Sequence, residues 1–169
     1  MRLVFYISVF LLLLLCSCKP EDTISLQYFT AIINGEKFKA VELTAKRYPM
    51  YDINYAEIQA TNVDISSGNL TELSKLKHFT VILAHDKIAP GYYQINPKEF
   101  SNYGIEYYFN YAEDSVDVLF PYEGYLNVEE VDYILDGDFI GNFELKGISG
   151  ILNDTIEIKE GKFKVKFSN

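Results

Sequence analysis

The stretch Tyr28-Phe-Thr-Ala-Ile-Ile-Asn-Gly-Glu-Lys-Phe-Lys-Ala-Val41 gives the first firm indication of the fold. Asn34-Gly35 is the strongest two-residue signal for a β-hairpin, because both positions of its tight turn need a positive φ. Closing a hairpin there gathers the apolar side chains on one face of the two strands. The expected cross-strand pairs are Ile33 with Glu36, Ala31 with Phe38 and Phe29 with Ala40, and the opposite face carries Thr30, Lys37 and Lys39.

A second hairpin is predicted near the C-terminus, where Thr155–Lys159 and Lys162–Phe167 flank Glu160-Gly161. Every apolar position of this pair agrees on one face, and a one-residue slip would expose the whole apolar set. The expected pairs are Ile158 with Phe163, Ile156 with Val165 and, on the reverse face, Glu157 with Lys164. This is the most consistent local pattern in the chain.

Further strands are predicted where apolar and polar residues alternate between turn residues. They are Tyr55–Asn62, His78–Ala84, Tyr92–Ile95, Glu106–Tyr111, Val116–Phe120, Tyr125–Tyr133 and Asp138–Lys146. We therefore expect residues 25–169 to form one all-β domain with little helix, an antiparallel β-sandwich of about nine or ten strands. A closed calycin-like β-barrel is the alternative that the same pattern allows.

The composition is acidic, with 15 Lys and Arg against 24 Asp and Glu and a net charge of −9. Such a chain repels phosphate backbones, so nucleic acid is not an expected partner. It also repels an anionic membrane surface, so any membrane attachment is expected to come from a covalent lipid. Both cysteines, Cys16 and Cys18, precede the domain, which therefore depends on its apolar core and not on disulfides.

The N-terminus has the order of an export signal. Arg2 is followed by the apolar stretch Leu3–Leu15, which as a helix would reach only about 20 Å, too short for a bilayer core of roughly 30 Å. That length fits the apolar region of a signal peptide, and a short transmembrane anchor or a chance apolar start is the alternative. We expect residues 1–17 to be the signal peptide.

Leu15-Cys-Ser-Cys18 resembles a bacterial lipobox, which implies that Cys18 becomes the lipid-modified N-terminus. The residues that follow, Lys19-Pro-Glu-Asp22, resemble the short tether that directs lipoproteins of the Bacteroidota to the outer face of the outer membrane. Residues 18–24 would then be a lipidated cysteine and a short acidic tether. The resemblance implies a cell-surface location, with the periplasmic face as the alternative.

The two predicted hairpins and the segment Ile134-Leu-Asp-Gly-Asp-Phe-Ile-Gly-Asn-Phe-Glu-Leu145 resemble a family of small Bacteroidota lipoproteins of unknown function. The likeness covers the two ends of the chain and implies a fold and a location, but no activity. Asp22-Thr23-Ile24 also resembles the O-glycosylation signal of Bacteroidota, which implies Thr23 as a glycosylation site, although a three-residue pattern also arises by chance.

Tyrosines and acids are interleaved between Tyr92 and Tyr125. Aromatic rings beside carboxylates are typical of sugar-binding β-sandwiches, since the ring stacks on the apolar sugar face and the acids bind hydroxyls. The candidate ligand-binding aromatics are Tyr103, Tyr107, Tyr108 and Tyr111. The alternative is that alternate tyrosines fill the core or coat one face of a sheet.

No catalytic residue, metal site or cofactor is predicted. The chain has no nucleophile-elbow, zinc-helix or phosphate-loop motif, and His78 and His85 are expected on opposite faces of one strand. Acid pairs such as Glu113-Asp114 and Glu129-Glu130 arise by chance in so acidic a chain.

The function expected from the sequence is therefore a surface-anchored, non-catalytic binding or accessory module for glycan or protein. The alternatives are a structural envelope lipoprotein and a carboxylate-dependent glycan hydrolase.

Overall fold

The computed structural model describes residues 26–50, 53–64, 75–85, 87–95, 103–112 and 115–168. Its ten strands are β1 (Tyr28–Ile33), β2 (Glu36–Lys39), β3 (Glu42–Met50), β4 (Ile53–Thr61), β5 (His78–His85), β6 (Gly91–Gln94), β7 (Tyr103–Ala112), β8 (Ser115–Val131), β9 (Asp138–Ser149) and β10 (Thr155–Lys166). The predicted signal peptide, Cys18 and Thr23 lie outside the described residues. None of the described residues forms a helix long and apolar enough to cross a membrane.

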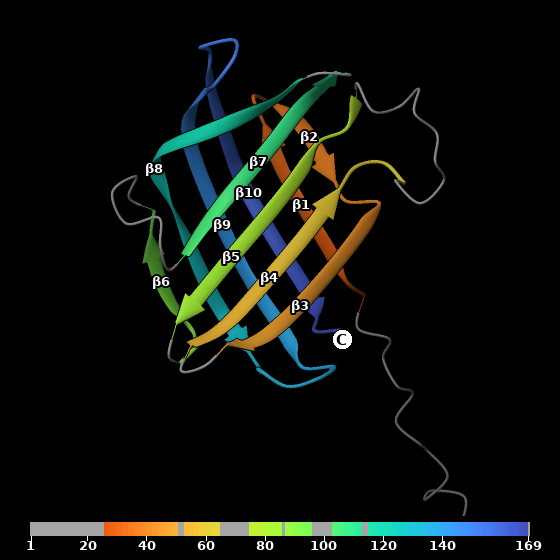
Figure 1. Ribbon diagram of the computed structural model, residues 1–169, viewed down its shortest axis with the longest axis vertical. Helices are drawn as coiled ribbons and strands as arrows, with labels where there is room; N and C mark the ends of the chain where they lie inside the picture. The colour runs from red at the N-terminus through yellow and green to blue at the C-terminus, as the bar shows by residue number, and fades with distance from the viewer. Residues whose placement is uncertain are drawn as a thin grey trace, which may run out of the picture.

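The strands form one antiparallel sheet in the order β2-β1-β10-β9-β8-β7-β5-β4-β3, with β6 added beside β8. The sheet is strongly curled, so that β3, β4, β5 and β7 lie in front of β1, β10 and β9 in Figure 1. The long strand β8 belongs to both layers, because its first half pairs with β7 and its second half pairs with β6. The all-β prediction is confirmed, and the curled sheet is a half-barrel.

Edge strand β3 contacts the chain just beyond β10, across the curled sheet. The backbone N–H of Ser168 donates to the carbonyl oxygen of Ala45 at 2.8 Å, and the Ser168 hydroxyl donates to the same oxygen at 3.0 Å. A parallel bridge joins Ser168 to Lys46 in β3. These contacts hold edge strand β3 against the C-terminal end of the chain.

The first predicted hairpin is confirmed with its register. Ile33 pairs with Glu36 and Ala31 with Phe38, while Asn34 and Gly35 have φ angles of 48° and 86°. The Ala40 N–H also donates to the carbonyl oxygen of Phe29 at 2.9 Å. The Asn-Gly turn therefore sets the pairing of β1 and β2, as the sequence predicts.

The second predicted hairpin is wrong, because Thr155–Lys166 is one continuous strand. Glu160 has a φ of 51°, but it lies in a β-bulge between Ile158 and Gly161 instead of a turn. A side chain at Gly161 would lie 2.6 Å from the Phe143 ring, so only glycine lets β10 pass this close to β9. The positive φ therefore serves a bulge within a strand that pairs with β1 on one side and β9 on the other.

Phenylalanine rings fill the space inside the curled sheet. Phe79 in β5 is fully buried, and its ring centroid lies 5.2 Å from Phe29, 4.9 Å from Phe38 and 4.6 Å from Tyr107. These rings come from both layers, so their contacts join the front and back of the half-barrel.

A buried carboxylate organises the turn between β9 and β10. Asp117 is 1% exposed and accepts hydrogen bonds from the Ser149 hydroxyl and, at 3.0 Å, from the Ile151 N–H. The Ser149 hydroxyl in turn accepts from the Leu152 N–H at 2.9 Å. One acid on β8 thus satisfies the polar groups of a turn more than 30 residues away in sequence.

Candidate functional site

The four tyrosines that the sequence indicates as ligand-binding do not share one face. Tyr107 is 1% exposed, and its ring stacks on Phe109 at 5.0 Å within the core. Tyr107 thus follows the alternative in which alternate tyrosines fill the core, because solvent does not reach its ring. Tyr103 is half-buried and packs against the same core, with its ring 5.5 Å from that of Tyr93.

Tyr108 points to the outer face of β7. Its hydroxyl donates to a carboxylate oxygen of Glu106 at 2.7 Å, and its ring centroid lies 5.8 Å from that of His78. The Tyr111 side chain lies outside the described part of the chain. Because residues of a strand alternate between faces, Tyr103 and Tyr107 point inward while Tyr108 points outward. They cannot form a single aromatic platform.

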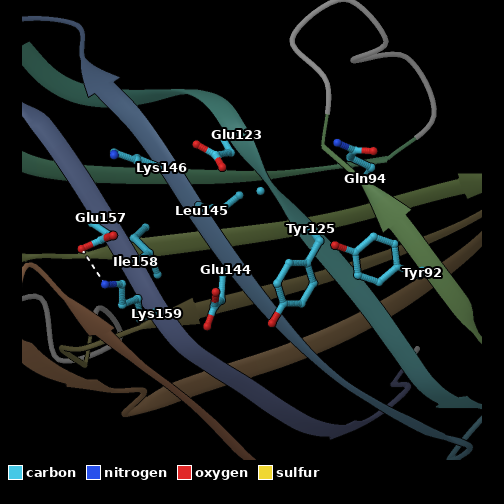
Figure 2. A pocket seen from close by; sticks show the side chains of 11 residues that line it. Tyr92, Gln94, Glu123, Tyr125, Glu144, Leu145, Lys146, Glu157, Ile158 and Lys159 are labelled. Carbon is cyan, nitrogen blue, oxygen red and sulfur yellow. Dashed lines mark ion pairs between the residues drawn. The ribbon is translucent and has the colours of Figure 1, made fainter.

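An aromatic pair does lie on the outer surface, at the junction of β6 and β8. The rings of Tyr92 and Tyr125 are stacked, with centroids 5.1 Å apart and planes 22° apart. Tyr92 is 65% exposed. The pair borders a hollow of about 290 Å³, hereafter the aromatic groove, whose lining includes Gln94, Glu123, Glu144 and Lys159. Figure 2 shows the two rings side by side at one end of this hollow.

Local sequence explains why these rings point outward. Leu126 and Val128 in β8 are buried, so the alternate positions Tyr125 and Asn127 are on the opposite face. The pairing of β6 with β8 then sets Gln94 opposite Tyr125 and Tyr92 opposite Asn127. Beside them, a side chain at Gly124 would clash with the carbonyl oxygen of Glu144, so a glycine is needed where β8 approaches β9.

Charged groups continue the aromatic groove across β9 and β10. In the strand register Lys146 lies between Glu123 on β8 and Glu157 on β10. The ammonium group of Lys159 forms an ion pair with Glu157 at 3.0 Å, as the dashed line in Figure 2 shows. The groove therefore offers both carboxylates and ammonium groups as hydrogen-bonding partners.

The phenol of Tyr125 is held in its neutral form. Burial raises its pKa above the usual value, and the negative charge of Glu144, with a smaller effect of Tyr92, raises it further. Tyr125 thus keeps its O–H proton at neutral pH and can both donate and accept a hydrogen bond.

Two side-chain amides lie beside the aromatic pair. Asn127 on β8 is paired in register with Asn142 on β9, next to the row that contains Tyr125. The Asn142 amide donates a hydrogen bond to the carboxylate of Glu129. An amide offers two donors and an acceptor, which suits a ligand whose hydroxyl groups both donate and accept.

The outer face around His78 is another place where titratable side chains gather. Burial lowers the pKa of His78, an effect that the carboxylates of Glu106 and Glu57 oppose. The described residues contain no group of three or more His, Cys, Asp or Glu side chains placed to hold a metal ion. The geometry at His78 supports hydrogen bonding and offers no metal-ligand set.

The sequence contained part of the signal for the aromatic groove. Tyr92 and Tyr125 bound the tyrosine-rich stretch, and Tyr125 alternates with apolar neighbours in a predicted strand. Their pairing could not be found from local pattern, because it depends on the short strand β6 adding to β8 more than 30 residues away.

Comparison with known proteins adds no relative to this geometry: no family model, no curated protein and no solved structure matches the chain.

Proposed function

We propose that this protein is a lipid-anchored, non-catalytic module that binds glycan through the aromatic groove. The observation that carries the proposal is the stacked pair of the exposed Tyr92 and the half-buried Tyr125, beside Glu144 and the amides of Asn127 and Asn142. A sugar presents an apolar face of C–H groups and a rim of hydroxyls. A ring paired with hydrogen-bonding side chains matches both features.

The aromatic pair is a better ligand site than a lone exposed ring, because its two rings hold each other in place at the surface. Most exposed large apolar residues of a soluble surface stand alone and need no explanation. Tyr92 and Tyr125 instead stack on each other, which fixes both rings before a ligand arrives and lowers the entropy cost of binding.

The anchor in this proposal is Cys18, lipidated after removal of residues 1–17 and joined to β1 by the short tether of residues 18–24. Two or more acyl chains give stable attachment, which one chain does not. The tether spans at most about 25–30 Å, so the domain stays close to the membrane. We place it on the outer membrane, facing the cell surface, where extracellular glycan would reach the groove.

The first test measures the melting temperature of the full chain, purified in detergent, against panels of oligosaccharides and short peptides. A ligand at 100 times its Kd adds about 2.7 kcal/mol of stability, which is a shift of several degrees for a domain of this size. A sugar class should produce that shift in the native chain and not in Tyr125→Ala. Tyr122→Ala is the matched control, since Tyr122 is an exposed tyrosine of the same strand that does not line the groove.

Other results would contradict the proposal in distinct ways. A shift with peptides alone would make the protein a peptide-binding module. Release of new reducing ends from a glycan would make it an enzyme, and no shift with any ligand would favour a structural role in the envelope.

A further inference from the structure

Four lysines without ion-pair partners lie together on the outer face of β2, β1 and β10. They are Lys37, Lys39, Lys162 and Lys164, hereafter the lysine face. Other lysines of the described residues, among them Lys77, Lys159 and Lys166, form ion pairs with neighbouring acids, whereas none of these four does. This is an unusual local excess of positive charge in a chain of net charge −9.

The lysine face is hollowed. A depression of about 340 Å³ lies between β1, β2 and the bulge of β10, and its lining includes Lys37, Lys39 and Lys162. Thr30 and Ile32 from β1 also line it, and so does Glu160 from the bulge of β10. A ligand group seated there would meet three ammonium groups against the one carboxylate of Glu160, over a partly apolar floor. This net positive charge suits an anion carried on a ring or a chain.

The strand register joins this hollow to the aromatic groove through one continuous row of paired residues. Lys39 pairs with Thr30 and Thr30 with Lys162. The row continues across the outer face through Asn142 and Asn127 to Tyr92. With neighbouring strands about 4.8 Å apart, Lys162 lies roughly 14 Å from Tyr92 along the row.

We propose that the lysine face is the anion-binding half of one extended site, and that its ligand is an acidic glycan bearing carboxylate or sulfate groups. This inference rests on the proposed function of the aromatic groove. Sugar rings of the ligand lie on Tyr92 and Tyr125, and charged groups farther along the same oligosaccharide contact Lys162 and Lys39. A single sugar cannot span the row, so full affinity needs an oligosaccharide.

Titration calorimetry on the full chain in detergent tests this, with neutral, carboxylated and sulfated oligosaccharides of equal length. At 0.1 M salt an acidic ligand should bind about tenfold more tightly than the neutral one, the gain expected from two or three exposed charge contacts. In 1 M salt the preference should vanish, because the screening length falls to about 3 Å. The carboxylated and sulfated ligands show which anion the hollow prefers.

The double variant Lys39→Gln and Lys162→Gln, which keeps Lys37 and Lys164, should lose most of the preference for the acidic ligands over the neutral one. Lys46→Gln is the matched control, since Lys46 is on β3 in the other layer, and it should keep the preference. An unchanged preference in the double variant would overturn the inference. The inference would also be overturned if the double variant bound all oligosaccharides normally and bound only phosphatidylglycerol vesicles more weakly, because the lysines would then face a membrane.

The failures of the two proposals are distinguishable. If neutral and acidic ligands bind with equal affinity, and if Tyr125→Ala abolishes the binding of both, the acidic-glycan inference is overturned while the proposed role of the aromatic groove stands. If an acidic ligand binds through the lysines and its affinity is unchanged in Tyr92→Ala and Tyr125→Ala, both the proposed function and the extended site are overturned.

Discussion

Replacing Asp117 tests how the turn between β9 and β10 is held. Asp117→Ala removes both acceptors that serve the Ser149 hydroxyl and the Ile151 N–H. Each hydrogen bond to a charged group contributes about 1.5–3 kcal/mol to stability. The variant loses two such bonds, but part of that loss is offset because no carboxylate has to be desolvated when the chain folds. We expect Asp117→Ala to lower the free energy of unfolding by about 3 kcal/mol.

Asp117→Asn is the matched control for shape. Its remaining oxygen can still accept from the Ile151 N–H, so the expected loss is about 1–2 kcal/mol. Urea unfolding of the full chain in detergent measures both values, and hydrogen exchange at Ile151 and Leu152 locates the effect. A loss under 0.5 kcal/mol in Asp117→Ala, with slow exchange kept at Ile151, would refute this account of the turn.

Three further outcomes follow from the core and the anchor. Phe79→Ala should cost about 3–5 kcal/mol in urea unfolding, because Phe79 is fully buried between both layers; a cost under 1 kcal/mol would contradict that packing. Burial and, secondarily, Glu36 raise the pKa of Tyr107, so its contribution is complete below pH 10 and declines as the pH rises above the unfolded value of about 10. Stability should thus fall above pH 10, and Tyr107→Phe should show a smaller fall; an equal fall would rule out Tyr107 as the cause. Cys18→Ala should leave the chain unlipidated, as intact mass would show, while an unchanged lipid mass would place the modification elsewhere.

The parts of the fold set by short-range chemistry were predictable. Asn34-Gly35 determined a turn, and the alternation on either side determined the register of β1 and β2. Most of the remaining strands were also found, because their inward positions are apolar and their outward positions polar.

The errors arose where one local signal serves two structures. Glu160-Gly161 has the positive φ of a hairpin turn, yet the same φ suits a bulge, and only the partners β1 and β9 decide between them. Val116–Phe120 and Tyr125–Tyr133 were predicted as separate strands, although the chain continues between them as a single β8 with a bulge between Pro121 and Glu123.

Strand β3 was not predicted, for a related reason. Its sequence carries Lys46, Arg47 and Pro49 and gives little apolar alternation. An edge strand pairs on one side only, so it tolerates proline and needs fewer apolar residues. Its contacts with β4 and Ser168 hold it in place, and both depend on the completed sheet.

The candidate site was only partly predictable for the same physical reason. Composition indicated that tyrosines between Tyr92 and Tyr125 were the place to look, but the choice among them depends on which side chains the curled sheet turns outward. Tyr107 enters the core and Tyr125 reaches the surface, and that difference follows from the packing of β5 and β6 against their neighbours.

Glycan binding through the aromatic groove requires a sugar to stack on Tyr92 and Tyr125. The most direct measurement is an NMR titration of the full chain in detergent, with its tyrosine rings labelled with carbon-13, against the oligosaccharide that gives the largest thermal shift. Such stacking should move the ring signals of Tyr92 and Tyr125 together, in proportion to bound ligand, while those of Tyr107 stay in place. Shifts confined to Tyr108 and its neighbours around His78, with Tyr92 and Tyr125 unmoved, would contradict it.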